Sequence, residues 1–388
     1  MANQTVDVVL VEDQAEQEEI FALRYEIYVR EMGKSPPEAD HRKGWIRDDL
    51  DPTARLYGLK SASGEIVGTV RINLLKEIND PEEQLSHLPL NSLLNLLNEE
   101  QISITSRLMV KPSWRGGTVL GLLLNQCYGD AVSLGIRADI CLSKPSLVEL
   151  YEQMGYRRFC PGINLDDVGY QVPMVLALLD REHLKRSRSP LLRHPACRNS
   201  DLKVDCSWIN GLGEEYRGLN HRLVDSDQFW NEAEKALCNP EIELPLFRDL
   251  SEEQSRSLLK TGTVLHCEAG DTVIRRGETQ QDLYVILEGV AEVWRTDEEK
   301  RLCLALLKTG DVFGEMGFLG RPRRSADVVA AIPMRILILT QTFLNRSIHH
   351  QPTAAALLLR NLSMVLAERL SQTTDRLWQL NNVQWGFD

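Results

Sequence analysis

The stretch from Phe313 to Val328 constrains the fold of this chain more than any other part of the sequence. Three glycines lie within seven residues of one another (Gly314, Gly317 and Gly320). Glycine lets backbone N–H groups converge into a nest that suits an anion. Glu315 follows the first glycine, and Arg324 comes nine positions later. A guanidinium offers a planar pair of donors to phosphate oxygens, and a carboxylate accepts from a sugar hydroxyl. The stretch therefore predicts a tight loop for a ligand with one phosphate and one free sugar hydroxyl.

The residues around this loop predict a small domain rich in β-structure. Ser251 and Gln254 have capping-box spacing at the start of a short helix. After that helix, short apolar runs alternate with turn signals that contain glycine (Gly270-Asp271, Gly277, Gly289 and Gly310-Asp311). Short strands with regular turns are typical of a β-roll or barrel. A long helix is expected from Ala354 to Leu380. We therefore expect residues 241–388 to form an α+β domain, a β-roll with C-terminal helices.

The loop resembles the phosphate-binding cassette of cyclic nucleotide-binding domains, the fold shared by the bacterial catabolite activator and cyclic-nucleotide kinases. Phe313-Gly314-Glu315, Arg324 and Ser325-Ala326 fall at the family's positions without a gap, although Arg323 separates Pro322 from the arginine. The resemblance covers about residues 241–380. It implies cyclic nucleotide binding, with cyclic AMP favoured over cyclic GMP, by Gly314, Glu315, Met316, Arg324, Ser325 and Ala326. The alternative is a surface hairpin whose charges are merely solvated.

Residues 1–180 alternate between strand and helix patterns. Apolar runs predict strands at Val8–Val11, Ala54–Leu59, Ile66–Leu74, Ile104–Val110, Ala138–Leu142 and Val172–Leu178. Apolar side chains at helical spacing predict helices at Gln14–Met32, Thr118–Leu134 and Ser146–Met154. Lys34 to Asp51 is polar and is expected to be a surface loop. Helices that alternate with strands around one mixed sheet make an α/β domain.

Short matches to a known family follow one another through this first domain. They are Arg24 and Tyr28, Asp48-x-x-Asp51, Gly68–Arg71, Ser106–Val110 and Leu150–Tyr156. In this order and spacing they resemble the GNAT superfamily of acyltransferases. The closer likeness is to the branch that uses acyl carrier proteins, the autoinducer synthases and N-acyl amino acid synthases. The resemblance implies a GNAT-like fold and a catalytic site that contains Arg24, Asp48, Asp51, Arg71, Ser106 and Arg107.

Two departures from the superfamily bear on the donor and the product. In Trp114–Gly121 the glycines stand in the wrong register for the pyrophosphate loop of acetyl-CoA enzymes. This favours an acyl-carrier-protein thioester as donor over acyl-CoA. Ile104 stands where the autoinducer synthases carry a glutamate three residues before the arginine. That substitution speaks against a homoserine-lactone product.

The reaction expected is acyl transfer from a thioester to an amine. Backbone N–H groups of Leu108–Val110 can stabilise charge on the thioester oxygen. The amine must lose a proton, and the candidate bases are Asp48, Asp51 and Glu31 or an ordered water. Arginine side chains could hold a substrate carboxylate, with Arg71 and Arg107 the candidates. Their alternative role is a structural ion pair with one of the aspartates.

Composition excludes some classes of function. The net charge of −12 argues against a nucleic-acid partner. No apolar run approaches 18 residues, so no transmembrane helix is expected. The eight cysteines are scattered without a Cys-x-x-Cys pair, which is typical of reduced thiols in the cytoplasm. His194-x-x-Cys197 with Cys206 lacks a fourth ligand at zinc spacing, so no metal site is expected.

Residues 181–240 are expected to connect the two domains. Six basic residues lie between Arg181 and Arg198, against Glu182 alone. Such a patch can dock an acidic acyl carrier protein, or it can be a solvated linker. Asp201–Pro240 contains four large aromatic side chains (Trp208, Tyr216, Phe229 and Trp230). It is therefore too apolar for disorder, and we expect it to pack between the domains.

These patterns leave several functions open. The first is an N-acyltransferase that acts on an amino acid-like amine under control of a cyclic nucleotide. The alternatives are a cyclic-nucleotide-gated protein lysine acetyltransferase that uses acetyl-CoA, and a non-catalytic cyclic-nucleotide sensor. A transcription factor is disfavoured because no helix-turn-helix segment is expected after the long helix. That helix carries an apolar stripe that predicts a homodimer or packing on its own β-roll (Leu359, Leu362, Leu366 and Leu370).

Overall fold

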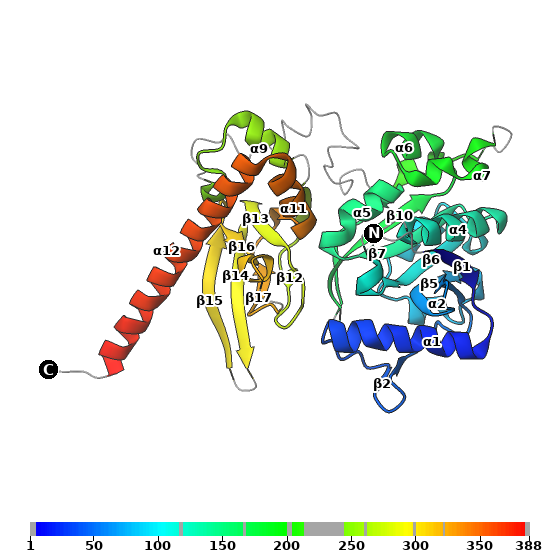
Figure 1. Cartoon of the computed structure of the whole chain (residues 1–388), viewed down its shortest axis with the longest axis horizontal. Coiled ribbons are helices and arrows are strands. Elements are labelled where there is room, and N and C mark those ends of the chain that lie inside the picture. Colours follow the sequence, from blue (N-terminus) through cyan, green and yellow to red (C-terminus); the bar gives the residue numbers. More distant parts are fainter. Residues whose placement is uncertain are drawn as a thin grey trace. The chain divides into compact units, whose positions relative to one another are not determined.

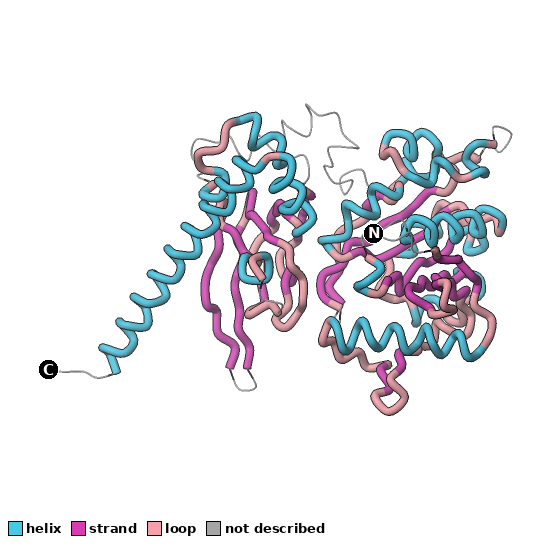
Figure 2. The backbone as a smooth tube through the Cα atoms, viewed as in Figure 1, coloured by secondary structure: helices cyan, strands magenta, loops and turns pink. Residues whose placement is uncertain are grey.

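The computed structural model describes residues 5–115, 119–165, 168–199, 204–212, 244–259, 262–297, 300–320 and 323–384. The chain forms two compact units (Figures 1 and 2). One comprises Met1–Gly218 with Asp271–Thr279, and the other comprises Leu219–Gly270 with Gln280–Asp388. Residues 213–243, which include Tyr216, Phe229 and Trp230, lie outside the described residues. The packing predicted for the last part of the connecting segment, residues 213–240, therefore stays a prediction.

The first unit is built on one mixed sheet of eight strands. Its order is β1 (Val6–Leu10), β4 (Arg55–Ser61), β5 (Ile66–Leu74), β6 (Ile102–Val110), β7 (Ala138–Ser143), β10 (Gly169–Ala177) and β8 (Arg157–Arg158), and β9 (Ile163–Leu165) also pairs with β10. The β6–β7 pair is parallel, and the other pairs are antiparallel. The predicted mixed sheet is confirmed.

Helices cover both faces of this sheet. Helix α1 (Gln14–Tyr25) begins at Asp13, whose carboxylate accepts hydrogen bonds from Ala15 N and Glu16 N at 2.9 and 3.2 Å. It continues as a π-helix, η1 (Glu26–Glu31), and packs with Leu56, Ile66 and Met109 on one face. Helix α4 (Val119–Ser133) packs on the other face, with Tyr57, Val67 and Val70. The helices predicted at Gln14–Met32 and Thr118–Leu134 are therefore present, and they pack on opposite faces of the sheet.

The shorter elements of the first unit complete its surface. A small hairpin, β2 (Ala39–Asp40) and β3 (Trp45–Ile46), occupies the segment that was expected to be a plain loop. The short α-helices are α2 (Pro81–Gln84), α3 (Leu90–Leu94), α5 (Val148–Met154), α6 (Arg181–Arg186) and α7 (Pro195–Arg198). The 3₁₀-helices are η2 (Leu75–Glu77), η3 (Glu99–Gln101), η4 (Pro112–Trp114), η5 (Pro145–Leu147), η6 (Pro190–Arg193) and η7 (Ser207–Gly211).

Two details correct the sequence analysis of this unit. The helix predicted over Ser146–Met154 begins later than expected, because Ser146 lies in η5 and α5 begins after Leu147 without a side-chain cap. Of the aromatic side chains expected between the domains, the structure describes Trp208, and it packs in a core cluster with Leu93, Ile102 and Phe159. All of these residues belong to the first unit, so Trp208 packs inside that unit, where its strands and helices cover the indole.

The second unit is a β-roll of two four-stranded sheets followed by helices. The sheet orders are β11 (Thr263–Cys267), β18 (Met334–Leu339), β13 (Leu283–Glu288), β16 (Val312–Phe313) and β12 (Thr272–Ile274), β17 (Asp327–Ala330), β14 (Val290–Asp297), β15 (Lys300–Lys308). The helices are η9 (Pro245–Phe247), α9 (Glu252–Leu259), α10 (Glu315–Phe318), α11 (Gln341–His350) and α12 (Pro352–Gln384). Ser251 and Gln254 form the predicted reciprocal cap, at 2.9 and 3.2 Å. The predicted β-roll with C-terminal helices is confirmed.

Helix α12 divides into two parts along its length. Ala354, Leu358 and Leu362 are buried in the core of the roll. Further along, Leu370, Leu377 and Trp378 are exposed, at 69%, 58% and 69% of their surface. Figure 1 shows this part of the helix running beyond the strands of its own unit. No helix among the described residues has both the length and the apolar character needed to cross a bilayer.

Candidate active site and nucleotide-binding site

Strand β6 is the element that organises the site of the first unit. Its ladder with β7 joins Ile102–Ile104 to Ala138–Ile140 and goes no further. Against β5, Thr69 pairs with Met109 but Arg71 pairs with Ser106, so β6 carries one extra residue there. Arg107 lies in this β-bulge with φ of 53°, a left-handed conformation that is uncommon for a residue other than glycine. Strained backbone of this kind gathers at functional sites, so the bulge is a candidate site.

A continuous chain of ion pairs surrounds the bulge. Arg24 Nη1 lies 2.8 Å from both oxygens of Asp51. Arg71 Nη1 contacts Asp48 and lies 3.2 Å from Asp51 Oδ1. Arg107 Nη2 donates to Asp48 Oδ2 at 2.7 Å and also contacts Glu38. We call these six residues the arginine network (Arg24, Glu38, Asp48, Asp51, Arg71 and Arg107). Three guanidinium groups face three carboxylates, so the network balances its own charge.

Burial sets the electrostatics of the arginine network. The Arg24 side chain is fully buried, and burial lowers its pKa while the charge of Asp51 opposes this effect. Burial alone would raise the pKa of Asp48, but the charges of Arg71 and Arg107 prevail and lower it to about 2. Asp48 is therefore ionised at neutral pH. A carboxylate with so low a pKa accepts a proton poorly, which weakens its candidacy as the general base.

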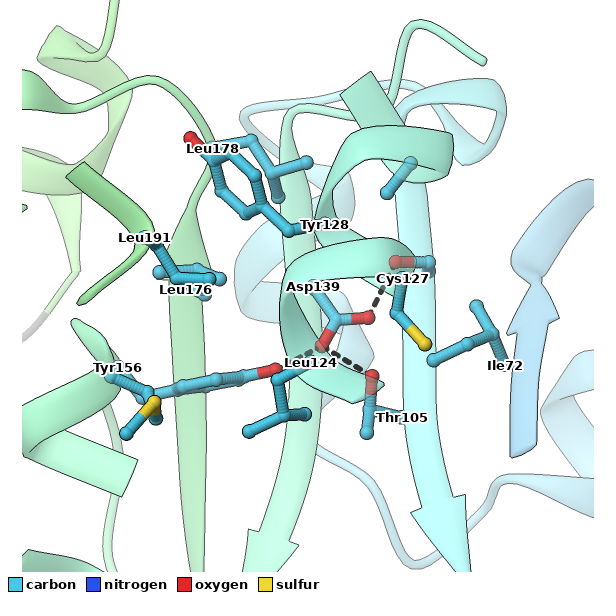
Figure 3. Close-up of a pocket in the computed structure, with 13 residues that line it drawn as sticks. Ile72, Thr105, Leu124, Cys127, Tyr128, Asp139, Tyr156, Leu176, Leu178 and Leu191 are labelled. Atoms are coloured by element: carbon cyan, nitrogen blue, oxygen red, sulfur yellow. Dashed lines mark hydrogen bonds between the residues drawn. The ribbon is translucent and has the colours of Figure 1, made fainter. Parts of the chain in front are cut away.

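A second cluster of polar side chains surrounds Asp139 in a pocket lined by residues of α4 and β10 (Figure 3). The Asp139 carboxylate on β7 is almost completely buried. It accepts hydrogen bonds from Thr105 at 2.7 Å, from Tyr156 at 2.6 Å and from Ser103. Burial raises the pKa of Asp139 to about 6, although the three hydroxyl donors act against this shift. Leucine side chains from α4 and β10 complete the wall of a cavity of about 30 Å³. This volume is enough to hold a water molecule.

The loop around Arg324 forms the site of the second unit. Arg324 is 5% exposed, and its two terminal nitrogens donate to Gly314 O at 2.7 Å and to Asp282 O at 2.8 Å. A Cβ atom at Gly314 or Gly317 would lie 2.7 Å from Arg324 Nη1, so both glycines are needed for this packing. Within the described part of the chain, the buried Nε of Arg324 has no hydrogen-bond partner. A buried cation in a cradle of glycines is suited to an anionic ligand.

The Arg369 side chain of α12 pairs with this loop. Arg369 Nη1 lies 3.2 Å from Glu315 Oε1, and Arg369 also donates to Val312 O. Glu315 begins α10, directly after Gly314, whose φ is 82°. A ligand that contacts Glu315 would therefore also act on the pairing between the loop and α12.

Comparisons with known proteins match both units. Residues 19–180 match the family model of the N-acyl amino acid synthase FeeM. Residues 264–350 match the family model of the cyclic nucleotide-binding domain. The chain joins a FeeM-type N-acyl amino acid synthase domain to a cyclic nucleotide-binding domain.

The individual relatives cover parts of this chain. It is 31% identical over 129 residues to the cyclic AMP receptor protein of Thermus thermophilus, which is 33% of this chain and 58% of that protein. It is 32% identical over 90 residues to a cAMP-dependent protein kinase regulatory subunit of Mycosarcoma maydis, 23% of this chain and 17% of the relative. The crystal structure of the Thermus thermophilus catabolite activator protein has 30% identity and a TM-score of 0.32. That match covers 35% of this chain and 63% of the solved one. The chain thus spans less than two thirds of the length of each of these relatives.

All six predicted residues of the synthase domain lie together. Five of the six belong to the arginine network. The sixth, Ser106, accepts a hydrogen bond from Arg71 Nε at 2.9 Å. Glu31, the third candidate base, is instead paired in two places with Arg115, at 2.6 and 2.8 Å. Arg115 also donates to Val110 O at 2.8 Å. Its guanidinium is therefore engaged by Glu31 and Val110, while residues 116–118 of the predicted loop lie outside the described residues.

Sequence reasoning missed two acidic residues of the synthase domain. Glu38 contacts Arg107, but its position in a polar segment gave no signal that set it apart. Asp139 stands alone in the otherwise apolar strand Ala138–Leu142, and a single acid in a buried strand was a signal that could have been followed.

The predicted residues of the nucleotide-binding domain also lie in one place. Gly314, Glu315 and Arg324 make the contacts described above. Ser325 Oγ lies 3.7 Å from Met316 Sδ, and Ala326 directly precedes β17. Arg323 is exposed, in contrast to the buried Arg324 beside it. Pro322 lies outside the described residues.

Proposed function

We propose that the synthase domain transfers an acyl chain from the thioester of an acyl carrier protein to the amine of an amino acid-like acceptor. One observation carries the proposal. Within a domain that matches the FeeM model, the residues implied by the family gather around the β6 bulge. The mixed sheet, with its single parallel pair that ends early, supports kinship with the GNAT superfamily.

The chemistry proposed needs few groups from the protein. The amine nitrogen attacks the thioester carbonyl carbon, a C–N bond forms, and the C–S bond breaks. The carrier's sulfur leaves as a thiolate and takes up a proton, while the amine releases one to a base or to water. Backbone N–H groups in Leu108–Val110, beyond the bulge, stabilise the negative charge that develops on the carbonyl oxygen. The strained conformation of Arg107 sets their direction.

The arginine network has a positioning role in this proposal. Its carboxylates neutralise its guanidiniums, so neither sign of charge is in excess. The fully buried pair of Arg24 and Asp51 fixes α1 to the segment that follows β3. Arg107 is more open, with 16% of its side chain exposed, and it lies over the Tyr28 ring at 5.4 Å. We therefore assign to Arg107 the contact with an acceptor carboxylate, and to Arg24 and Arg71 the support of the site.

We also propose that a cyclic nucleotide, with cyclic AMP favoured, regulates the transfer. The buried Arg324 holds the phosphate and Glu315 accepts from the ribose hydroxyl, which supports a ligand of that shape. Binding at Glu315 changes its pairing with Arg369, so α12 responds to the ligand. The exposed apolar residues of α12 support a homodimer through this helix. The match to the synthase family and the scattered cysteines, without a Cys-x-x-Cys pair in the sequence, support a cytoplasmic location.

The test is turnover of the full chain with each donor, with and without cyclic AMP. Amide formation is followed by mass spectrometry with acyl carrier protein thioesters, acyl-CoA and acetyl-CoA, against a panel of amino acids and a lysine peptide. We expect transfer from the carrier thioester, changed about 5- to 150-fold by the nucleotide, the usual range of coupling. Transfer from acetyl-CoA to the peptide alone would assign a protein acetyltransferase instead. No transfer from any donor, with nucleotide binding intact, would leave a sensor without enzymatic activity.

A further inference from the structure

The β2–β3 hairpin is a positively charged projection on an acidic chain. Between Ala39 and Arg47 the sequence carries one carboxylate, Asp40, and three cations (Arg42, Lys43 and Arg47), while the whole chain has a net charge of −12. All three cations are exposed. Figure 1 shows the hairpin projecting from its unit beside α1. Arg30 on η1, also exposed, adds a cation at its base, although Glu26 pairs with it.

The tip of the hairpin is held in one shape. Asp40 Oδ1 accepts from Arg42 N at 2.9 Å and from Lys43 N at 3.0 Å, and Asp40 O accepts from Gly44 N at 2.8 Å. Gly44 takes φ of 69°, which a residue with a side chain would adopt only at a cost. The cations at the tip are therefore presented on a defined turn.

Both ends of the hairpin are tied to the β6 bulge. Glu38 directly precedes β2, and Asp48 follows β3 by two residues. Both carboxylates contact the Nη2 atom of Arg107, the residue at the bulge. A protein that docks on the hairpin is thus held next to the proposed site of acyl transfer.

We propose that this hairpin docks the acidic carrier protein that delivers the acyl thioester. The inference rests on the proposed function and adds to it the surface that receives the donor. Charge complementarity between exposed cations and an acidic protein increases the rate of encounter and fixes orientation. The hairpin is joined to the bulge through Arg107, and the thioester carried by a docked protein must reach that bulge.

The aromatic side chains of the hairpin and of the neighbouring α1 argue against a nucleic acid as the occupant. Bases stack on open aromatic faces. Here Lys43 lies 4.8 Å from the Trp45 ring centre, and Arg47 lies 5.7 Å from that of Phe21. The Tyr25 hydroxyl is hydrogen-bonded to His41 Nδ1 at 2.9 Å, and the Arg30 guanidinium lies 5.9 Å from the centre of the Tyr25 ring. The protein's own cations thus lie over the faces of these rings, where a base would otherwise stack. A lipid surface is also disfavoured, since the exposed large apolar side chains of the described residues lie outside this hairpin.

The basic stretch from Arg181 to Arg198 is less well placed for this task. Strand β10 leads into it, and its last residue, Ala177, pairs with Ala138 at the start of β7. The β6–β7 ladder is closed at that end and opens only after Ile140. Arg181 is also engaged, since its Nε donates to Cys197 O at 2.8 Å. Figure 1 shows α6 and α7 at the end of the unit opposite the hairpin.

The test compares two double charge reversals in the full-length protein. One is Arg42→Glu with Lys43→Glu at the tip of the hairpin. The matched control, Lys185→Glu with Arg193→Glu, makes the same change of charge on exposed residues of the other basic stretch. Binding of a fluorescent holo-acyl carrier protein is measured by anisotropy at low and physiological salt. KM and kcat are measured with the carrier thioester and with a small acyl thioester that has no protein part.

We expect the hairpin variant to bind the carrier about tenfold more weakly and to raise its KM, with kcat and the small thioester unchanged. The salt dependence of binding should become shallower, and the control should stay within about twofold of the wild type. Unchanged binding by the hairpin variant, or a loss in the control alone, overturns the inference. If the wild type transfers no acyl group, the proposed function fails, and anisotropy still decides whether the hairpin binds the carrier. Binding of anionic vesicles or of a single-stranded oligonucleotide, without binding of the carrier, also overturns it.

Discussion

Removal of the Arg324 side chain should abolish most of the affinity for cyclic AMP. The guanidinium is 5% exposed, and two of its nitrogens are fixed by backbone carbonyls at 2.7 and 2.8 Å. Its charge is therefore held in place before a ligand arrives, so little ordering is required on binding. Gly314 and Gly317 pack against the same side chain, and no other residue fits there.

The magnitude follows from the burial of this charge. Loss of one partner from a buried, hydrogen-bonded charge pair weakens binding by about 2–5 kcal/mol. At 1.4 kcal/mol for each tenfold change, Arg324→Ala should raise Kd by roughly 30-fold to a few thousandfold. Arg323 is exposed, and a charge at the rim contributes about 0–1 kcal/mol, so Arg323→Ala should change Kd by less than about fivefold.

Isothermal titration calorimetry with cyclic AMP measures both variants. Arg324→Ala also leaves Gly314 O and Asp282 O without their donor, so its folding must be checked by thermal unfolding without ligand. Arg324→Lys keeps the positive charge and loses the planar pair of donors, and its affinity should lie between the two. If a folded Arg324→Ala protein binds with unchanged affinity, or if Arg323→Ala shows the larger loss, the phosphate is held elsewhere and the assignment is wrong.

Three further predictions concern stability and assembly. Asp51→Asn leaves the fully buried Arg24 without its counter-charge and should lower the free energy of unfolding by about 3–5 kcal/mol in urea. Glu26→Gln breaks an exposed pair and should cost less than about 1 kcal/mol, and equal losses in the two would contradict this ranking. Since the pKa of Asp139 is raised to about 6, the folded state keeps a proton that the unfolded chain releases between about pH 4 and pH 6. The stability of the wild type relative to Asp139→Asn should therefore fall by roughly 3 kcal/mol as pH rises through this window, and a flat difference would refute the assignment. Light scattering should give a dimer for the full chain and a monomer after charges are placed at Leu370 and Trp378, whereas a monomeric wild type would exclude the interface.

The sequence by itself determined the local elements and the kinds of residue at both sites. Apolar spacing at Ile20, Leu23 and Ile27 predicted the helix that forms α1 and η1, and apolar runs predicted the long strands, because periodicity fixes which face of an element can be buried. That the cassette residues gather in one place could be predicted, since the glycines, Glu315 and Arg324 lie within one short segment, while their contacts with a ligand stay a prediction. All six residues implied for the synthase site also proved to lie together.

Tertiary structure alone decided how those residues are used. Whether an arginine is open to a substrate or consumed in an ion pair depends on carboxylates far along the chain, such as the pairing of the buried Arg24 with Asp51 across 27 positions. The raised pKa of Asp139 arises from burial beneath α4 and β10, which no local pattern contains. The bulge at Arg107 is likewise a matter of register between β5 and β6. Such features depend on non-local packing and on the loss of water around a charge, and both exist only once separate segments have come together.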